Sequence, residues 1–307
     1  FEEKTDVMKV ALDVHTHTIA SGHAYSSMQE MVDSAARKGL QILGITEHGP
    51  SIKGTCYPVY FDNLHVVPRE QKGVKLLLGC EINILNTDGE LDLPMKSIRK
   101  LDIRIAGIHQ SCYRAGTKDE NTDGMIQVMK NNEIDIISHP ADGSAELHIE
   151  RIVEAAKDHR ILLEINNSSL NPNRGKPHAW ENNRQLLRLC KKYGLMVIMG
   201  SDAHISFQIA DYTHLYPLLA ETDFPDELIM NYWPKKFFEY LGIKLNLPKI
   251  IAESSALTAI IALSLVMGIP TAMVAVPITA GVLGSALAFI GITKWQSKKR
   301  TNGQSRT

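Results

Sequence analysis

The sequence predicts an α/β fold, a parallel (β/α)7 barrel, followed by a hydrophobic helical hairpin near the C-terminus. Three observations lead to this prediction. Short apolar segments alternate with amphipathic segments over residues 9–245, as strands alternate with helices in parallel α/β proteins. Histidine and acidic residues follow almost every apolar segment. A later stretch of 40 residues, 254–293, carries no charged side chain.

Seven strands are expected, one fewer than in the usual eight-stranded barrel. Their apolar runs lie at 10–14, 41–46, 75–80, 103–107, 134–138, 161–166 and 196–200. Helical spacing of apolar residues follows at 28–38, 122–132, 146–159 and 181–193, and a closing helix is expected over 225–241. Ser27 and Glu30 form a capping-box pattern at the start of the first helix.

The charge and cysteine content exclude several classes of protein. The 307 residues include 33 basic and 34 acidic side chains, and residues 1–293 hold 28 basic against 34 acidic ones. An acidic domain of this kind is not expected to bind nucleic acid. Four scattered cysteines provide neither a disulfide framework nor a C-x-x-C metal motif, so a reducing, cytoplasmic environment is expected.

Side chains that bind metal ions end six of the seven predicted strands. The carboxyl ends of barrel strands gather on one face of the molecule, where active sites form. His15 and His17 are two residues apart and therefore share one side of an extended strand, as do Asp202 and His204 if the strand geometry continues. With His23, in the loop after the first strand, the candidate ligands are His15, His17, His23, His48, Glu81, His109, His139, Asp202 and His204.

Nine ligands are too many for one tetrahedral ion and suit two or three ions that share a carboxylate. Imidazole and carboxylate groups accept zinc, manganese or iron. A single histidine at a strand end is commonly structural, whereas six strand ends that agree indicate a site. The other histidines fall in predicted helices and loops: His65, His148, His159, His178 and His214.

The motifs of this region resemble the PHP (polymerase and histidinol phosphatase) superfamily, in particular its stand-alone bacterial phosphatases with three zinc ions. The motifs are D-V-H-T-H, H-A-Y-S, I-T-E-H-G-P, G-C-E-I-N, I-I-S-H-P, E-I-N-N-S-S and G-S-D-A-H. The resemblance covers residues 9–245 and implies a phosphatase domain with a distorted (β/α)7 barrel. Glu47 is the one departure, since relatives often have Asp there, and it adjoins a ligand without being one.

The resemblance also implies how three divalent ions are held, with zinc expected ahead of manganese or iron. The ligands of the first ion are His15, His17, Glu81 and Asp202. Glu81 bridges to the second ion, which is held by His109 and His139. The ligands of the third ion are His23, His48 and His204.

The predicted function is hydrolysis of a small phosphomonoester by a hydroxide that bridges two of the ions, with Glu81 and Asp202 as the catalytic carboxylates. Asn166 and Asn167, after the sixth strand, are candidates for substrate binding or for closing a turn. Histidinol phosphatase is an alternative within the same superfamily. An amidohydrolase often has a carboxylated lysine at a middle strand, where this sequence has Glu81, His109 and His139.

Two further alternatives are a nuclease and a non-catalytic, membrane-tethered metal-binding module. The acidic balance disfavours the nuclease. The complete ligand set disfavours the non-catalytic module, because degenerate family members are expected to lose ligands.

The uncharged stretch predicts a membrane-associated segment at 250–293, followed by a basic tail at 294–307. Forty helical residues would extend about 60 Å, twice the roughly 30 Å of a bilayer core. Gly268, Pro270 and Pro277 would interrupt that helix, so a hairpin is expected. Lysines flank both sides of it, which places both ends in the cytoplasm and tethers a cytoplasmic catalytic domain to the membrane. A hairpin packed on the protein is the alternative.

Overall fold

The computed structural model describes residues 8–130 and 133–242, which belong to the first of the two units of the chain, Phe1–Leu245. The hydrophobic segment and the basic tail predicted at 250–293 and 294–307 lie outside the described residues. Among the helices that the structure describes, none is long and apolar enough to cross a membrane.

Seven parallel strands follow one another in a single sheet, in the order β1-β2-β4-β5-β6-β7-β8. Their bounds are Leu12–Asp13, Ile42–His48, Val74–Asn83, Ile103–Gly107, Ile136–Ile137, Leu162–Asn166 and Val197–Gly200. A further short strand that the sequence did not predict, β3 (Glu70–Gln71), pairs antiparallel with the start of β4. The order and direction of the strands confirm the predicted (β/α)7 arrangement.

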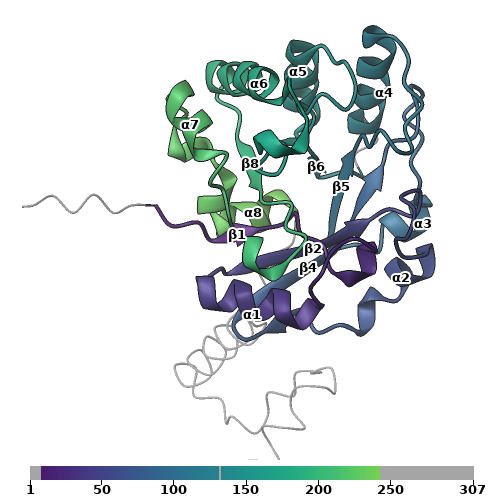
Figure 1. The fold of residues 1–307 in the computed structure, drawn as a ribbon, viewed down its shortest axis with the longest axis vertical. Coiled ribbons are helices and arrows are strands. Elements are labelled where there is room, and N and C mark those ends of the chain that lie inside the picture. The colour runs from purple at the N-terminus through teal and green to yellow at the C-terminus, as the bar shows by residue number, and fades with distance from the viewer. Residues whose placement is uncertain (1–7, 131–132, 243–307) are drawn as a thin grey trace, which may run out of the picture. The chain divides into compact units, whose positions relative to one another are not determined.

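Helices surround the sheet, with α1 and α2 on the side opposite α5 and α6 (Figure 1). The α-helices, α1 to α8, are Met28–Lys38, Pro58–Asp62, Met95–Ile98, Lys118–Lys130, Ile149–His159, Ala179–Tyr193, Tyr216–Thr222 and Pro234–Tyr240. The 3-10 helices, η1 to η6, are Ile19–Ser21, Leu64–Val66, Pro172–Arg174, Ser206–Gln208, Asp226–Leu228 and Met230–Tyr232.

Local sequence explains where two of these helices begin. The helix predicted at 122–132 begins earlier, because Thr117 and Glu120 exchange capping hydrogen bonds ahead of α4. The prediction of one closing helix over 225–241 is wrong in its first half. Pro234 has no N–H to donate and fits only the first turn of a helix, so α8 begins there.

Two apolar cores result from the alternation of side chains along the strands. One lies between the sheet and the helices. The other contains one or two residues from every parallel strand, and Phe237 and Phe238 of α8 pack against it. This second core lines the barrel with aliphatic and aromatic side chains, and the candidate ligands lie beyond it, at the carboxyl ends of the strands.

The buried side chain of Asn231 joins the first and last strands of the barrel. Its Nδ2 donates to the carbonyl oxygens of Leu12 in β1 (3.0 Å) and Met199 in β8 (2.8 Å), and its Oδ1 accepts from the Met199 N–H (2.7 Å). At the carboxyl end, the His17 N–H donates to the Ala203 carbonyl (2.9 Å). These contacts close the seam between β1 and β8.

Replacing Asn231 with alanine should therefore destabilise the fold. The change removes a partner from three buried backbone groups, of which the Met199 carbonyl keeps a hydrogen bond from the Tyr212 hydroxyl (3.5 Å). At about 1–3 kcal/mol for each of the other two, we expect the free energy of unfolding to fall by roughly 2 kcal/mol or more. Urea denaturation followed by circular dichroism measures it. Asn63→Ala is the control, because Asn63 is exposed and makes no capping bond. A loss below about 1 kcal/mol for Asn231→Ala would contradict this account of the seam.

Candidate metal centre

The predicted ligands gather at the carboxyl ends of the strands, around Glu81 in β4. This strand was expected to end at Cys80, but it continues to Asn83 because it pairs with β2 on one side and β5 on the other. In this register Glu81 lies opposite His48, the last residue of β2. Glu81 is therefore inside a strand, and its fully buried side chain occupies the middle of the barrel.

Five imidazole nitrogens surround the Glu81 carboxylate at 2.8–3.6 Å. Oε2 faces three of them, on His48 (2.8 Å), His15 (3.3 Å) and His17 (3.6 Å). Oε1 faces two, on His139 (2.8 Å) and His109 (3.4 Å). Burial alone would raise the pKa of Glu81, yet the facing imidazoles, His15 foremost, hold that pKa well below its usual range.

Several buried nitrogen and oxygen atoms that could bind a metal ion lie close together without forming hydrogen bonds. Within residues 8–130 and 133–242, no hydrogen-bond partner is found for His15 Nε2, His17 Nε2, His48 Nδ1 or Glu81 Oε2. Asp202 Oδ1 lies 3.7 Å from His15 Nε2 and 3.3 Å from His17 Nε2. Ligands of a tetrahedral zinc ion are about 3.3–3.6 Å apart, given bonds of about 2.0–2.2 Å. Unpartnered lone pairs at this spacing fit a metal ion, so the residues present fit the predicted centre.

Burial lowers the pKa of two of these histidines and keeps them neutral, the form in which imidazole binds metal. The pKa of His48 falls to about 4, mainly because the ring is buried. The pKa of His17 falls well below its usual value, because the ring is buried and stands beside His48 and His204.

His23, His48 and His204 form a further group of candidate ligands, next to the one around Glu81. Its Nε2 lies 3.2 Å from His48 Nε2 and 3.1 Å from His204 Nε2. His48 therefore faces two groups of ligands, because its Nδ1 contacts Glu81 as well. The sequence did not predict this double contact.

Two of the candidate ligands have a left-handed backbone, which is uncommon outside glycine. His139, after β6, has φ +32°, and Asp202, after β8, has φ +54°. The expectation that strand geometry continues through Asp202 and His204 is therefore wrong. The turn instead brings His204 Nδ1 to 2.9 Å from the Asp202 carbonyl oxygen. Backbone strain of this kind is concentrated at functional sites.

Glu164 in β7 contacts two of the ligands from outside, and the sequence analysis missed it. Its Oε1 accepts from His15 Nδ1 (2.6 Å), and its Oε2 accepts from the His139 N–H (2.9 Å). A β-carbon at Gly200 would lie 1.7 Å from Glu164 Oε1, so only glycine leaves room for this carboxylate. The signal available in the sequence was an acidic residue inside the apolar run I-L-L-E-I-N.

Glu47 stabilises the loop that carries His17 and His23. Its Oε2 accepts from Ser21 Oγ (2.6 Å) and the Thr18 N–H (3.0 Å), and Ser21 Oγ lies 3.2 Å from His17 Nδ1. Burial raises the pKa of Glu47, while these hydrogen bonds oppose the rise. Glu47 thus orients a ligand through Ser21.

The two asparagines predicted as substrate contacts are buried and engaged in the protein. Asn166 Nδ2 donates to Glu164 (3.2 Å), and its Oδ1 accepts from the Ser169 N–H (2.8 Å). Asn167 Oδ1 accepts from the His214 N–H (2.9 Å). These bonds match the alternative role, in which the asparagines hold the turn after β7.

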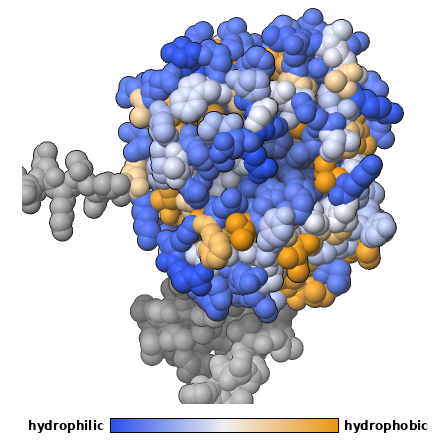
Figure 2. All heavy atoms as spheres, in the orientation of Figure 1, coloured by the Kyte–Doolittle hydropathy of each residue, from blue (hydrophilic) through white to orange (hydrophobic). Residues whose placement is uncertain are grey.

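A cavity of about 280 Å³ lies beside the candidate ligands. Figure 2 shows a largely hydrophilic face that is hollowed near its middle. Lys176 Nζ pairs with Asp142 and donates to Ser144 Oγ (2.8 Å). Arg174 donates to Ser168 Oγ (2.7 Å), and no carboxylate pairs with it among the described residues. Lining residues outside the predicted set are Ile52, Ser111, Asp142, Ser168, Ser169, Arg174 and Lys176.

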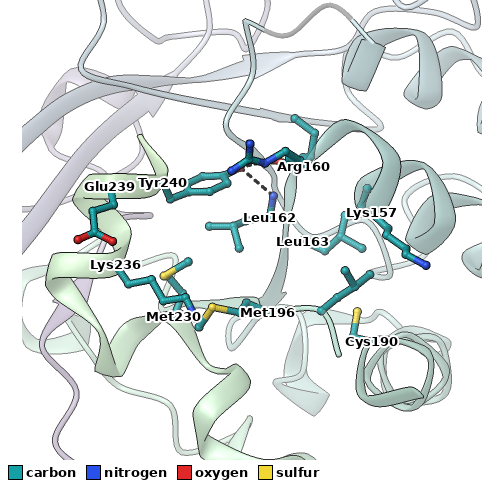
Figure 3. A pocket seen from close by; sticks show the side chains of 13 residues that line it. Lys157, Arg160, Leu162, Leu163, Cys190, Met196, Met230, Lys236, Glu239 and Tyr240 are labelled. Carbon is teal, nitrogen blue, oxygen red and sulfur yellow. Dashed lines mark hydrogen bonds between the residues drawn. The ribbon is translucent and has the colours of Figure 1, made fainter. Parts of the chain in front are cut away.

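A second hollow, of about 410 Å³, lies near the amino ends of β7 and β8. Figure 3 shows Leu162, Met196 and Met230 around it, with the Tyr240 hydroxyl bonded to the Leu162 N–H. The described residues that line it are mainly apolar and include no histidine. It is therefore not a candidate for the metal chemistry.

A parallel barrel with a histidine-rich cluster at the carboxyl ends of its strands has the architecture of a metal-dependent α/β-barrel enzyme. Residues 13–168 match the PHP domain, and the chain belongs to that family. This confirms the family predicted from the motifs.

Curated relatives and a solved structure are similar to this chain. A protein named "Probable phosphatase" from Acetivibrio thermocellus is 43% identical over 237 residues, 77% of this chain and 97% of the relative. A "Probable phosphatase" from Clostridium novyi is 42% identical over 248 residues, 80% of this chain and 100% of the relative. Histidinol phosphate phosphatase from Lactococcus lactis, solved with zinc, L-histidinol and phosphate, is 18% identical with a TM-score of 0.49, and the match covers 70% of this chain and 95% of that one.

Zinc should stabilise the metal-stripped protein, because its binding removes the cost of the buried, unpartnered ligand atoms. Free zinc at about 100 times its dissociation constant adds about 2.7 kcal/mol per site, which raises the Tm by roughly 5–10 °C for a domain of this size. Differential scanning fluorimetry with and without zinc measures the shift. His17→Gln should reduce it, whereas His148→Gln, outside the cluster, should not. If zinc did not change the Tm of the metal-stripped wild-type protein, the predicted metal centre would be excluded.

Proposed function

We propose that this chain is a metal-dependent phosphoesterase that hydrolyses small phosphomonoesters at a trinuclear centre. The observation that carries the proposal is the convergence of seven imidazoles and two carboxylates beside a polar cavity of about 280 Å³, with the atoms around Glu81 fully buried and His23 at the exposed edge. Membership of the PHP family and the names of the curated relatives support the hydrolysis of phosphate esters.

The ligand atoms divide into three overlapping groups, one for each ion. Spacing supports a group of His15, His17, Glu81 and Asp202 and a group of Glu81, His109 and His139, which share Glu81. His23, His48 and His204 form the third group. His48 also lies within reach of Glu81 and His109, and with His204 it lies within reach of His17. Zinc suits these ligands best, and manganese or iron would also be accepted. When bound, divalent ions lower the pKa of water and neutralise the charge of a phosphate group.

The two carboxylates differ in their access to substrate. Glu81 is fully buried and lies between the ligand groups, so its role is to hold two ions at a fixed separation. Asp202 leaves 16% of its side chain exposed and lines the cavity. Burial would raise the pKa of Asp202, but the nearby His15 and His17 hold that pKa well below its usual range. Asp202 therefore stays ionised and orients groups at the cavity floor.

The cavity wall favours a small anionic substrate. Arg174 is the free cation of this wall among the described residues, while the charge of Lys176 is paired with Asp142. Serine hydroxyls from Ser111, Ser168 and Ser169 complete a polar lining. Arg174 would bind a phosphate group in the cavity that six of the candidate ligands also line.

The alternatives fit less well. An amidohydrolase-type centre often has a lysine at a middle strand end, where this chain has Glu81, His109 and His139, and Lys176 is bound to Asp142. A non-catalytic module would not need all nine ligands to converge beside a cavity. Histidinol phosphatase shares the proposed chemistry and differs only in the alcohol portion of the substrate, so substrate screening decides it.

Replacing Asp202 with asparagine should abolish most of the activity with the fold intact. The change removes a charged ligand, and we expect kcat/KM to fall about 100-fold or more. The measurement is release of inorganic phosphate from p-nitrophenyl phosphate and from a panel that includes L-histidinol phosphate, with circular dichroism for the fold. Asp226→Asn, at an exposed position, is the matched control. Unchanged turnover in Asp202→Asn would refute the catalytic assignment.

Replacing Arg174 with alanine should weaken substrate binding more than the chemical step. Loss of one charged contact to phosphate is expected to raise KM about 10-fold, equivalent to about 1.4 kcal/mol, and Arg174→Lys should recover part of the loss. Steady-state kinetics on the best substrate of the panel separate KM from kcat. Arg188→Ala, on the exposed face of α6, controls for the loss of a surface charge. An unchanged KM would remove Arg174 from the substrate site.

A further inference from the structure

We propose that Asp92 is a positioning residue that prepares His109 for metal binding by fixing the orientation of Asn83. The inference rests on the proposed metal centre and adds to it a residue that lies outside the predicted ligand set. Asp92 follows β4, beyond the bridge between Ile84 and Leu91, and its half-buried side chain turns back toward that strand.

The first step is the tautomer of His109. Its Nδ1 lies 2.7 Å from Asn83 Oδ1. An amide oxygen only accepts hydrogen bonds, so the imidazole proton must be on Nδ1. The lone pair is then on Nε2, which faces Glu81 Oε1 at 3.4 Å. This is the tautomer that can bind a cation held between His109 and Glu81.

The second step is the orientation of the Asn83 amide. Asn83 Nδ2 donates to Asp92 Oδ2 at 2.5 Å. An ionised carboxylate has no donor, so a flipped amide would place two acceptors against each other and point an NH₂ group at His109. Asp92 itself is fixed by N–H groups of Ser51 (2.8 Å) and Asn83 (2.9 Å). The carboxylate therefore sets which end of the amide His109 meets.

The third step is the space for this arrangement. A β-carbon on Gly49 would lie 2.5 Å from Asp92 Oδ1, 2.6 Å from Asp92 Oδ2 and 2.9 Å from Asn83 Nδ2. The glycine of the I-T-E-H-G-P motif thus leaves room for both side chains. Asn83 is two residues after Glu81 in β4, so both point into the barrel. Gly49 and Asn83 belong to the motifs I-T-E-H-G-P and G-C-E-I-N but are not ligands themselves. Their contact with Asp92 gives both of them a structural role.

Three variants test the proposal. In Asp92→Asn, the new amide can either donate to or accept from Asn83, so the orientation is no longer fixed. In the exchanged pair, N83D with D92N, the new carboxylate at 83 accepts from His109 Nδ1 and from the new amide at 92, which restores the tautomer but gives up the hydrogen bond from the Ser51 N–H. Asp135→Asn is the matched control, because Asp135 is a buried carboxylate bonded to Arg104 and lies before β6, at the other end of the barrel.

Zinc binding to the purified full chain is measured by metal content per chain across chelator-buffered free zinc. Nitrogen NMR of labelled histidines in zinc-free protein reports the tautomer, with the His109 signal assigned by its loss in His109→Gln. We expect Asp92→Asn to bind one zinc ion about 10–100-fold more weakly and to show a mixed His109 tautomer. The exchanged pair should recover both properties, and Asp135→Asn should match the unmodified protein.

Wild-type zinc affinity in Asp92→Asn, or weak zinc binding in that variant with an unchanged His109 tautomer, would overturn the positioning role. These outcomes are independent of the proposed function. A protein that binds zinc as expected but releases no phosphate from any ester would refute the phosphatase proposal and leave the role of Asp92 intact.

Discussion

A carboxylate buried among five imidazoles is the constraint on which the rest of this structure depends. Glu81 has no water to solvate it, and its neighbours are groups that can be neutral or charged. A negative charge in such a place is stable only if cations lie close to it, as protons on the rings or as metal ions. Several ring nitrogens and one oxygen of Glu81 lack hydrogen-bond partners, which favours metal ions.

The barrel meets this constraint by dividing its interior in two. Aliphatic and aromatic side chains line one part, and the candidate ligands lie beyond it, at the carboxyl ends of the strands. A further set of carboxylates then surrounds the ligands. Glu164 contacts His15 directly, Glu47 reaches His17 through Ser21, and Asp92 reaches His109 through Asn83. In each of these three rings Nδ1 makes the outer hydrogen bond and Nε2 faces Glu81. The acidic residues outside the ligand set therefore determine the orientation of the rings.

Much of this arrangement could be predicted from the sequence, because the ligands depend on local pattern. Strand periodicity and the residue types at strand ends were enough to indicate that His15, His17 and His48 meet. The residues that orient the ligands could not be found in this way, since Glu164 and His15 are 149 residues apart and meet only across the closed barrel. The turn at Asp202 was also missed, because its left-handed backbone is imposed by the surrounding structure rather than by the residue itself.

The cavity wall was the least predictable part of the site. Arg174 ends the short helix η3 in the connection between β7 and α6, where the sequence gives no sign of whether an exposed base meets solvent or substrate. Its place in the wall follows from the position of the loop over the barrel mouth, which is a property of the whole fold.

The Asn231 seam has a consequence for the order in which the protein matures. The first strand, β1, is held to β8 through a residue that the ribosome adds more than two hundred positions later. His15 and His17 therefore cannot take their final positions beside Asp202 until synthesis has passed residue 231. The contacts that hold β1 beside β8 are therefore complete only when nearly all of the barrel has been synthesised, so a chain stalled before residue 231 would carry the candidate ligands without the seam that brings the two strands together.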